Sequence, residues 1–215
     1  QKIEKMLKTK SQQEIKNILA QALKEIIPSC ESTNLPIGIG IAGIIDNKTY
    51  TMTNSPNIPS LNGVKLKEFF SSIGKNMIID NDANMAAMGE YWQGAGVGAK
   101  NLLCITLGTG VGGGLILEGK LWHGVSGGAG EIGHIVVEPE GYICGCGGHG
   151  CLEQYASAQA INRWAHEAIE KGAKTSLKHE EQISSKIVYE HAKKGDKIAR
   201  KIFERVGYYL GIGLT

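Results

Sequence analysis

The chain has 215 residues, 42% of them hydrophobic and 20% charged, which is typical of a globular protein with one large or two small domains. Its formal net charge of +2 is too small to indicate a protein that binds nucleic acid or an anionic membrane surface. No apolar run approaches the roughly 20 residues that a membrane-spanning helix needs.

The first part of the sequence predicts alternating helices and strands. Isoleucine and leucine at helical spacing predict a helix over 12–27, ended by Pro28, and a β-branched run predicts a buried strand over 36–45. Asp46-Asn47 closes this strand, and 48–54 is its expected hairpin partner. We then expect a helix over 66–73, a strand over 77–80 and a helix over 84–93.

A glycine-rich link at 94–98 is the predicted boundary between two lobes, 1–98 and 99–215. After it we expect strands over 102–107 and 115–117, joined by a glycine-rich turn, and then helices over 162–171, 184–193 and 197–210. This order indicates an α/β protein. The chain begins with Gln1 and ends at Thr215 inside a predicted helix, so we expect it to be part of a longer protein.

Three of the five cysteines, Cys144, Cys146 and Cys151, lie within eight positions, and His134 precedes them by ten residues. Three thiolates and one imidazole make a closed tetrahedral set of ligands, which predicts a structural zinc site. The alternatives are buried free thiols or a disulfide. The spacing is not that of a zinc finger, so nucleic-acid binding does not follow.

The turn Gly108-Thr109-Gly110-Val111-Gly112-Gly113-Gly114 satisfies the pattern G-x-G-x-x-G. A dinucleotide fingerprint would require a helix after it, but a strand is predicted there, and the lysine of a P-loop is missing. We therefore interpret it as a β-turn-β whose bare amides hold phosphate oxygens. The alternative is a tight hairpin, although five glycines in seven residues exceed what a hairpin needs.

Polar residues mark the rest of the predicted site. Asn81 and Asp82 follow the strand at 77–80, where ligands of α/β proteins usually bind, so Asp82 is either a general base or a helix N-cap. Glu131, His134 and Glu153 lie among glycines and could hold a polyhydroxylated ligand. Their alternatives are surface ion pairs for the glutamates and a purely zinc-binding role for the histidine.

Together these motifs resemble the ROK family of bacterial sugar kinases and sugar-responsive repressors, in order and in spacing. The motifs are Asn81-Asp82-Ala83-Asn84, the glycine turn, Glu131-Ile132-Gly133-His134 and the segment from Cys144 to Glu153. The resemblance implies an actin-like, ribonuclease-H-like α/β fold of two lobes with a structural zinc loop. It implies Asp82 as the base, sugar hydroxyls bound by Asn81, Asp82, Glu131, His134 and Glu153, and ATP phosphate bound by the glycine turn.

The resemblance also implies the reaction and the partners. We expect phosphoryl transfer from Mg-ATP to a hexose hydroxyl, namely the 6-hydroxyl of glucose or a related (N-acetyl)hexose. Such relatives are often dimers or tetramers, and thiolate zinc ligands are typical of a reducing cytoplasm. The family's first phosphate loop, Asp-x-Gly-Gly-Thr, has no counterpart before Pro36, and the relatives continue beyond the final helix. The alternative is the sugar-sensing effector domain of a repressor, which would bind DNA through a separate domain.

Overall fold

The structure, a computed structural model, describes residues 10–26, 36–71 and 76–215. The chain divides into two compact units, one made of Gln1–Cys104 and Gly114–Gly130, the other of Ile105–Gly113 and Glu131–Thr215. The sequence predicts a single boundary between residues 98 and 99. In the structure the chain passes between the units three times, because the segment Gly114–Gly130 returns to the first unit.

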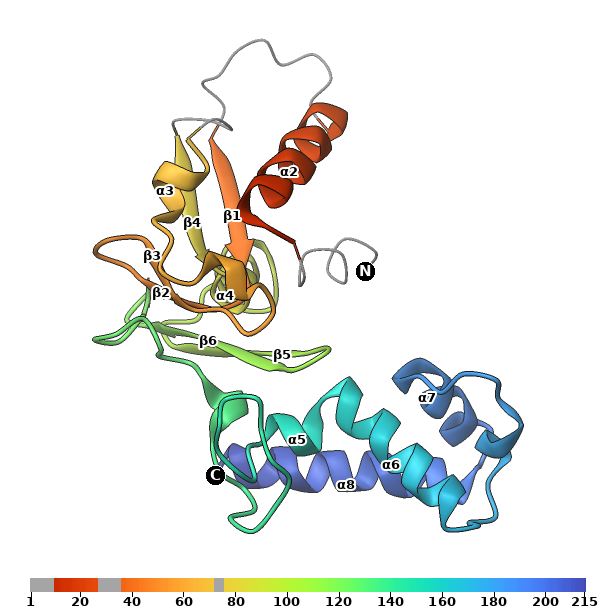
Figure 1. The fold of residues 1–215 in the computed structure, drawn as a ribbon. Coiled ribbons are helices and arrows are strands. Elements are labelled where there is room, and N and C mark those ends of the chain that lie inside the picture. The colour runs from red at the N-terminus through yellow and green to blue at the C-terminus, as the bar shows by residue number, and fades with distance from the viewer. Residues whose placement is uncertain (1–9, 27–35, 72–75) are drawn as a thin grey trace. The chain divides into compact units, whose positions relative to one another are not determined.

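The described residues of the first unit form two small two-stranded sheets, three α-helices and part of a further sheet (Figure 1). Its elements are α2 (Gln12–Ile26), β1 (Ile37–Ile41), β2 (Ile44–Asp46), β3 (Thr51–Asn54), the 3-10 helix η1 (Pro59–Leu61), α3 (Leu66–Phe69), β4 (Met77–Asn81) and α4 (Asp82–Gln93). Strand β1 pairs with β4 in parallel, and β2 pairs with β3 antiparallel. The parallel register places Ile41 opposite Asn81, so β1 and β4 end together.

The prediction of one continuous strand over 36–45 is wrong, because the chain breaks between β1 and β2. Gly43 lies there with a φ of 138°. A Cβ at this position would lie only 2.5 Å from the carbonyl oxygen of Asn54. Only glycine combines this conformation with so close an approach, and the chain uses it to leave one sheet and enter the next.

Several other predicted boundaries shift. Strand β3 is shorter than the predicted 48–54, since residues 47–50 form the turn, and α4 begins two residues before the predicted 84. Helix α3 covers only the first part of the predicted 66–73. The predicted ends of two helices, at residues 27–28 with Pro28 and at residues 72–73, lie outside the described residues.

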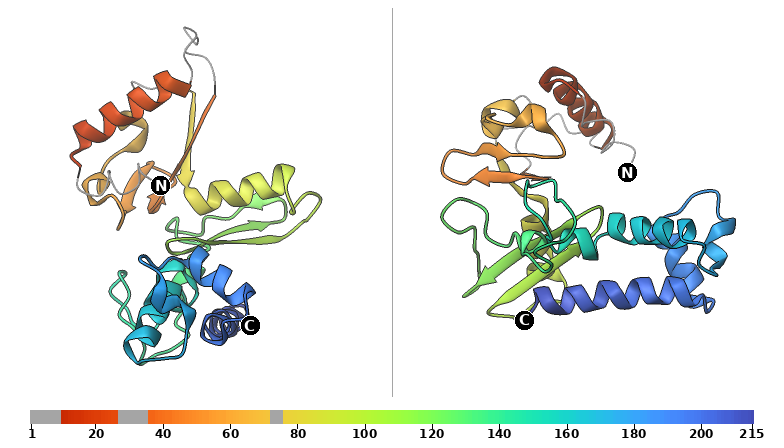
Figure 2. Two further views of the ribbon diagram at one scale, coloured as in Figure 1. Left: turned by 90° about the vertical axis from the view of Figure 1, so that its right-hand side faces the viewer. Right: turned by 60° about the horizontal axis from the view of Figure 1, so that its bottom comes forward.

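The core of the first unit depends on the alternation of isoleucine and glycine along β1. Ile41 is buried with Ile15 of α2 and Ile79 of β4, and α2 lies along β1 (Figures 1 and 2). The intervening glycines face α4 instead. A Cβ at Gly40 would lie 3.3 Å from the Cα of Asp82, so the glycine lets the start of α4 come close to the strand.

Three strands, β5 (Leu102–Leu107), β6 (Val111–Leu117) and β7 (Lys120–Leu121), form a sheet in that order, and the boundary between the units passes through β5 and β6. The β-turn-β that the sequence predicts over 108–114 is present. Its turn is shorter than predicted, because Val111 already belongs to β6 and only residues 108–110 connect the strands.

The second unit is mainly helical. Its elements are the 3-10 helices η2 (Ile132–His134) and η3 (Ser176–His179) and the helices α5 (Glu153–Ala156), α6 (Ala158–Glu170), α7 (Ser185–Lys193) and α8 (Lys197–Gly213). Helix α8 runs along α5 and α6 (Figures 1 and 2), and Tyr155, Trp164 and Tyr209 pack together in the buried core. None of the described helices is long and apolar enough to cross a membrane.

Candidate active site and metal centre

Asn81 caps the helix that begins at the end of β4. Its Oδ1 accepts hydrogen bonds from the backbone N–H groups of Ala83 and Asn84, over 2.8 and 3.2 Å. Its Nδ2 donates to the carbonyl oxygen of Gly43, over 3.0 Å. These contacts make Asn81 the N-cap of α4, the role that the sequence left open for Asp82.

Asp82 is therefore the first residue of α4, and its carboxylate is not needed for the cap. Its Oδ1 accepts a hydrogen bond from the N–H of Ala83, over 3.0 Å. The described residues provide no side-chain partner for it. An ionised carboxylate that is not engaged by another side chain can accept a proton.

A cavity of about 300 Å³ lies beside Asp82 within the first unit. Its lining is mostly apolar, with contributions from Ile39 and Phe70, and its polar side chains are those of Asn57 and Asp82. The sequence does not single out Asn57, which lies in the loop between β3 and η1. Only the folded chain brings this amide, 25 positions earlier, to the same cavity as the carboxylate of Asp82.

The glycine turn has a well-defined backbone in the second unit. The N–H of Gly108 donates to the carbonyl oxygen of Gly110, over 3.0 Å, and Gly108 in turn accepts from the N–H of Ala158. Thr109 is exposed at the tip. The N–H of Val111 donates to Oε2 of Glu153, over 3.1 Å. Glu153, predicted to bind sugar, thus contacts the turn that is predicted to bind phosphate.

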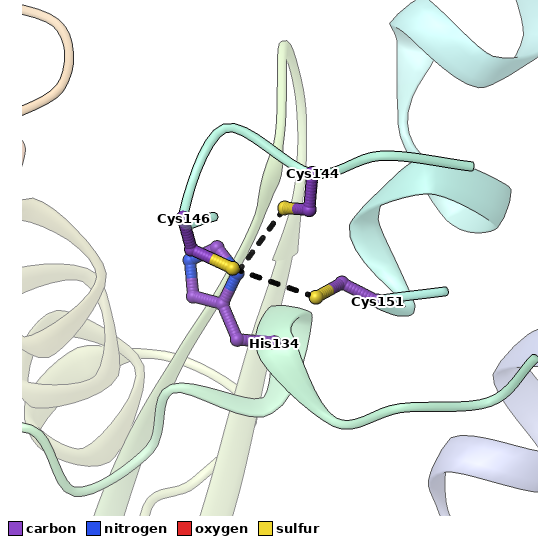
Figure 3. A group of neighbouring side chains, drawn as sticks. All are labelled: His134, Cys144, Cys146 and Cys151. Atoms are coloured by element: carbon purple, nitrogen blue, oxygen red, sulfur yellow. Dashed lines mark hydrogen bonds between the residues drawn. The ribbon is translucent and has the colours of Figure 1, made fainter. Parts of the chain in front are cut away.

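The four predicted zinc ligands converge in the second unit (Figure 3). Their ligand atoms all lie within 4.8 Å of one another. Sγ of Cys144 lies 3.6 Å from Nδ1 of His134, and Sγ of Cys146 lies 3.6 Å from Sγ of Cys151. Tetrahedral zinc with ordinary bond lengths would separate such atoms by about 3.5–3.8 Å. The geometry therefore fits a zinc ion.

The chemistry of the thiols also fits a metal. Burial raises the pKa of Cys151 to about 12, whereas the backbone N–H of Gly148 lowers the pKa of Cys146. Cys144 and Cys151 are each only 2% exposed. A bound Zn²⁺ would replace the proton of a buried thiol and leave its charge compensated.

The ring of His134 faces two groups. Nδ1 is directed at Cys144, while Nε2 lies 3.7 Å from Oε2 of Glu131. The structure is therefore compatible with both predicted roles of His134, since one ring nitrogen can bind a metal and leave the other for a carboxylate or a ligand. The predicted residues are divided between the units, with Asn81 and Asp82 in the first and Glu131, His134 and Glu153 in the second.

Comparison with known proteins decides the family. The ROK family matches residues 1–215, the whole length of the chain.

The chain belongs to the ROK family.

Two of the proteins to which the chain is similar are glucokinases. The glucokinase of Halalkalibacterium halodurans is 43% identical over 191 residues, which are 86% of this chain and 58% of that protein. A ROK family glucokinase from Streptomyces griseus in complex with glucose and AMPPNP has a TM-score of 0.81 and 37% identity, and the match covers 96% of this chain and 68% of that one. This ROK chain thus spans less than two thirds of the curated glucokinase.

A third relative is a regulator. The ROK family transcriptional regulator that is a homologue of the E. coli MLC protein has a TM-score of 0.82 and 28% identity, and the match covers 95% of this chain and 52% of that one. The fold alone therefore does not separate kinases from transcriptional regulators within the ROK family.

Proposed function

We propose that this protein is an ATP-dependent hexose kinase that phosphorylates glucose or a related N-acetylhexose, at the 6-hydroxyl. Its similarity to two glucokinases, at 43% and 37% identity, supports this function. One observation within the chain carries it furthest. Asn81 caps α4, so that the carboxylate of Asp82 has no structural task there and lines a cavity.

In the proposed reaction a sugar hydroxyl oxygen attacks the γ-phosphorus of ATP, and the bond to ADP breaks. Asp82 accepts the hydroxyl proton as the new bond forms, which as general base catalysis contributes about 10²–10⁴-fold. The glycine turn, Gly108 to Gly114, would offer backbone N–H groups to the phosphates from positions other than Gly108 and Val111, whose N–H groups are already engaged. Mg²⁺ bound with ATP would neutralise the charge that develops on the phosphates.

The remaining residues would orient the sugar. Asn81 uses its Oδ1 for the helix cap, so it can offer only an Nδ2 hydrogen to a sugar hydroxyl. The second unit would supply the carboxylate acceptors of Glu131 and Glu153 and the imidazole of His134. Holding the hydroxyl in line with the phosphate contributes several kcal/mol through orientation alone.

Zinc held by His134, Cys144, Cys146 and Cys151 would have a structural task. It leaves no coordination position open and would set the orientation of the His134 ring. Thiolate ligands indicate a reducing compartment, so we expect a cytoplasmic protein. The family resemblance further implies a dimer or a tetramer.

The second candidate is a sugar-sensing repressor domain. The TM-score of 0.82 with the transcriptional regulator supports it. A sensor needs to bind sugar but needs no base. The carboxylate of Asp82, which has no side-chain partner among the described residues, favours the kinase.

The test uses the full-length protein with ATP, Mg²⁺ and a panel of glucose, mannose, N-acetylglucosamine and N-acetylmannosamine. We expect ADP release coupled to one or two of these sugars. A protein that binds one of the sugars and a DNA operator, yet releases no ADP with any of them, would be a repressor instead.

A further inference from the structure

Asp80, one position before Asn81, carries a buried carboxylate, and both of its carboxylate oxygens have polar partners. The residue is 8% exposed. Its Oδ1 accepts hydrogen bonds from the backbone N–H of Asn81, over 2.7 Å, and from Nδ2 of Asn84, over 2.9 Å. Its Oδ2 lies 2.6 Å from Nε2 of His123. Asp80 thus joins the last peptide of β4, the first turn of α4 and a distant histidine.

His123 lies at the start of the loop that leads to Glu131. It follows β7 by two positions, and its carbonyl oxygen accepts a hydrogen bond from the N–H of Ala129, over 3.1 Å. The same loop packs against β2, since a Cβ at Gly127 would lie 2.1 Å from the carbonyl oxygen of Ile45. His123 therefore ties this loop to the end of β4.

We propose that His123 is a positioning residue for phosphoryl transfer, because it holds Asp80, and Asp80 holds the backbone N–H of Asn81 and the side chain of Asn84, which lie on either side of Asp82 in the chain. The inference rests on the proposed kinase function. A base must stay within hydrogen-bond reach of the proton it accepts, and misplacement by about 1 Å can lower a rate a hundredfold. A charge-assisted hydrogen bond of 2.6 Å at a partly buried carboxylate is strong enough to resist such movement.

Without His123, Oδ2 of Asp80 would lose its only partner among the described residues while remaining largely buried. A buried carboxylate that lacks a partner recruits water or rotates toward solvent. Either change disturbs Oδ1, which holds the N–H of Asn81. The effect of losing His123 should therefore appear at the β4–α4 junction and in the catalytic rate, more than in sugar affinity.

The experiment compares three variants of the full-length protein. His123→Leu removes the ring nitrogens, whereas His123→Gln retains an amide N–H near the position of Nε2. The matched control is His191→Leu, which breaks a similar pair in the second unit, where Nε2 of His191 lies 2.8 Å from Oε1 of Glu180. We measure kcat and KM for the best sugar, and amide hydrogen exchange of the peptide covering residues 78–86.

We expect His123→Leu to lower kcat at least tenfold with less than a threefold change in the sugar KM, and His123→Gln to recover most of the rate. Exchange in 78–86 should accelerate in His123→Leu and not in His191→Leu. A kcat within twofold of wild type in His123→Leu, or equal losses in His191→Leu, would overturn the proposal. If wild type phosphorylates no sugar, the kinase function fails, and unchanged exchange in His123→Leu then refutes the positioning role separately.

Discussion

Oε2 of Glu153 lies 3.1 Å from the backbone nitrogen of Val111 and accepts its hydrogen bond. A carboxylate from the start of α5 therefore accepts a hydrogen bond from a backbone N–H of the turn that is proposed to bind phosphate. The approach depends on the glycine before Val111, because a Cβ at Gly110 would lie only 2.0 Å from the same oxygen. The residue proposed to bind sugar and the turn proposed to bind phosphate are thus in direct contact.

Gly110→Ala should displace Glu153 and destabilise the second unit. We expect a lower Tm and weaker glucose binding in the full-length protein, since the displaced carboxylate loses the N–H of Val111. The matched control is Gly207→Ala on α8, where a Cβ meets no atom within 4 Å. That change should raise stability by up to about 1 kcal/mol, as alanine is the better helix former. Thermal unfolding measures the Tm of each variant, and calorimetric titration measures its glucose affinity. A Gly110→Ala variant with the wild-type Tm and glucose affinity would contradict the contact.

The purified protein should contain one zinc per chain, measured by elemental analysis. Cys151→Ser should lose the metal and lower the Tm by several degrees, because binding of a structural metal is coupled to folding. Cys104→Ser is the matched control, since Cys104 is a free, half-buried thiol outside the metal cluster. Well-folded wild-type protein without zinc would refute the site.

Asp82→Asn should separate catalysis from binding. The amide is nearly isosteric with the carboxylate but cannot accept the proton, so kcat should fall about a hundredfold or more while sugar affinity changes little. Asp46→Asn is the control in the same unit, because Asp46 holds the N–H groups of a surface turn, at Lys48 and Thr49. A coupled assay that shows near-wild-type turnover for Asp82→Asn would remove Asp82 from the reaction.

Asp196 should make the second unit sensitive to acid. Burial works against its charge, yet the N–H of Ala199 and the N–H and hydroxyl of Ser176 outweigh burial and lower its pKa. In the unfolded chain an aspartate has a pKa of about 3.9. The stabilisation by Asp196 is therefore complete above that pH and is lost as the pH falls through the lower pKa of the folded protein.

Asp196→Asn tests this dependence. An amide can still cap α8, but its nitrogen cannot accept the bonds that Thr175 and Ser176 donate to Oδ2. We expect a loss of about 1–2 kcal/mol at pH 7. The difference from wild type should shrink below about pH 4, and urea unfolding at several pH values would measure it. A difference that is independent of pH would mean that the charge of Asp196 contributes nothing.

The sequence predicts the convergence of the four proposed zinc ligands, because three of them are close together along the chain. Cys144, Cys146 and Cys151 are local, and glycines between them permit one tight loop. The helix cap was not predictable in the same way. Asn81 and Asp82 are adjacent and both suit an N-cap, so only the observed hydrogen bonds separate the cap from the free carboxylate.

The features that the sequence did not predict depend on contacts between residues far apart in the chain. His123 and Asp80 are 43 positions apart, and Glu153 and Val111 are 42 apart, so no local pattern links either pair. The break at Gly43 has the same origin. A run of β-branched residues predicts a strand, but a pairing change from β4 to β3 requires a bend that hydrophobicity does not reveal.

The burial of Trp164 gives the protein a built-in optical probe. Trp164 is 3% exposed inside the helical unit, whereas Trp92 and Trp122 of the other unit are 74% and 52% exposed. Blue-shifted emission should therefore come from Trp164 alone, and emission near that of free tryptophan from the other two. Following both wavelengths through a denaturant titration would show whether the two units lose structure in one transition or in two.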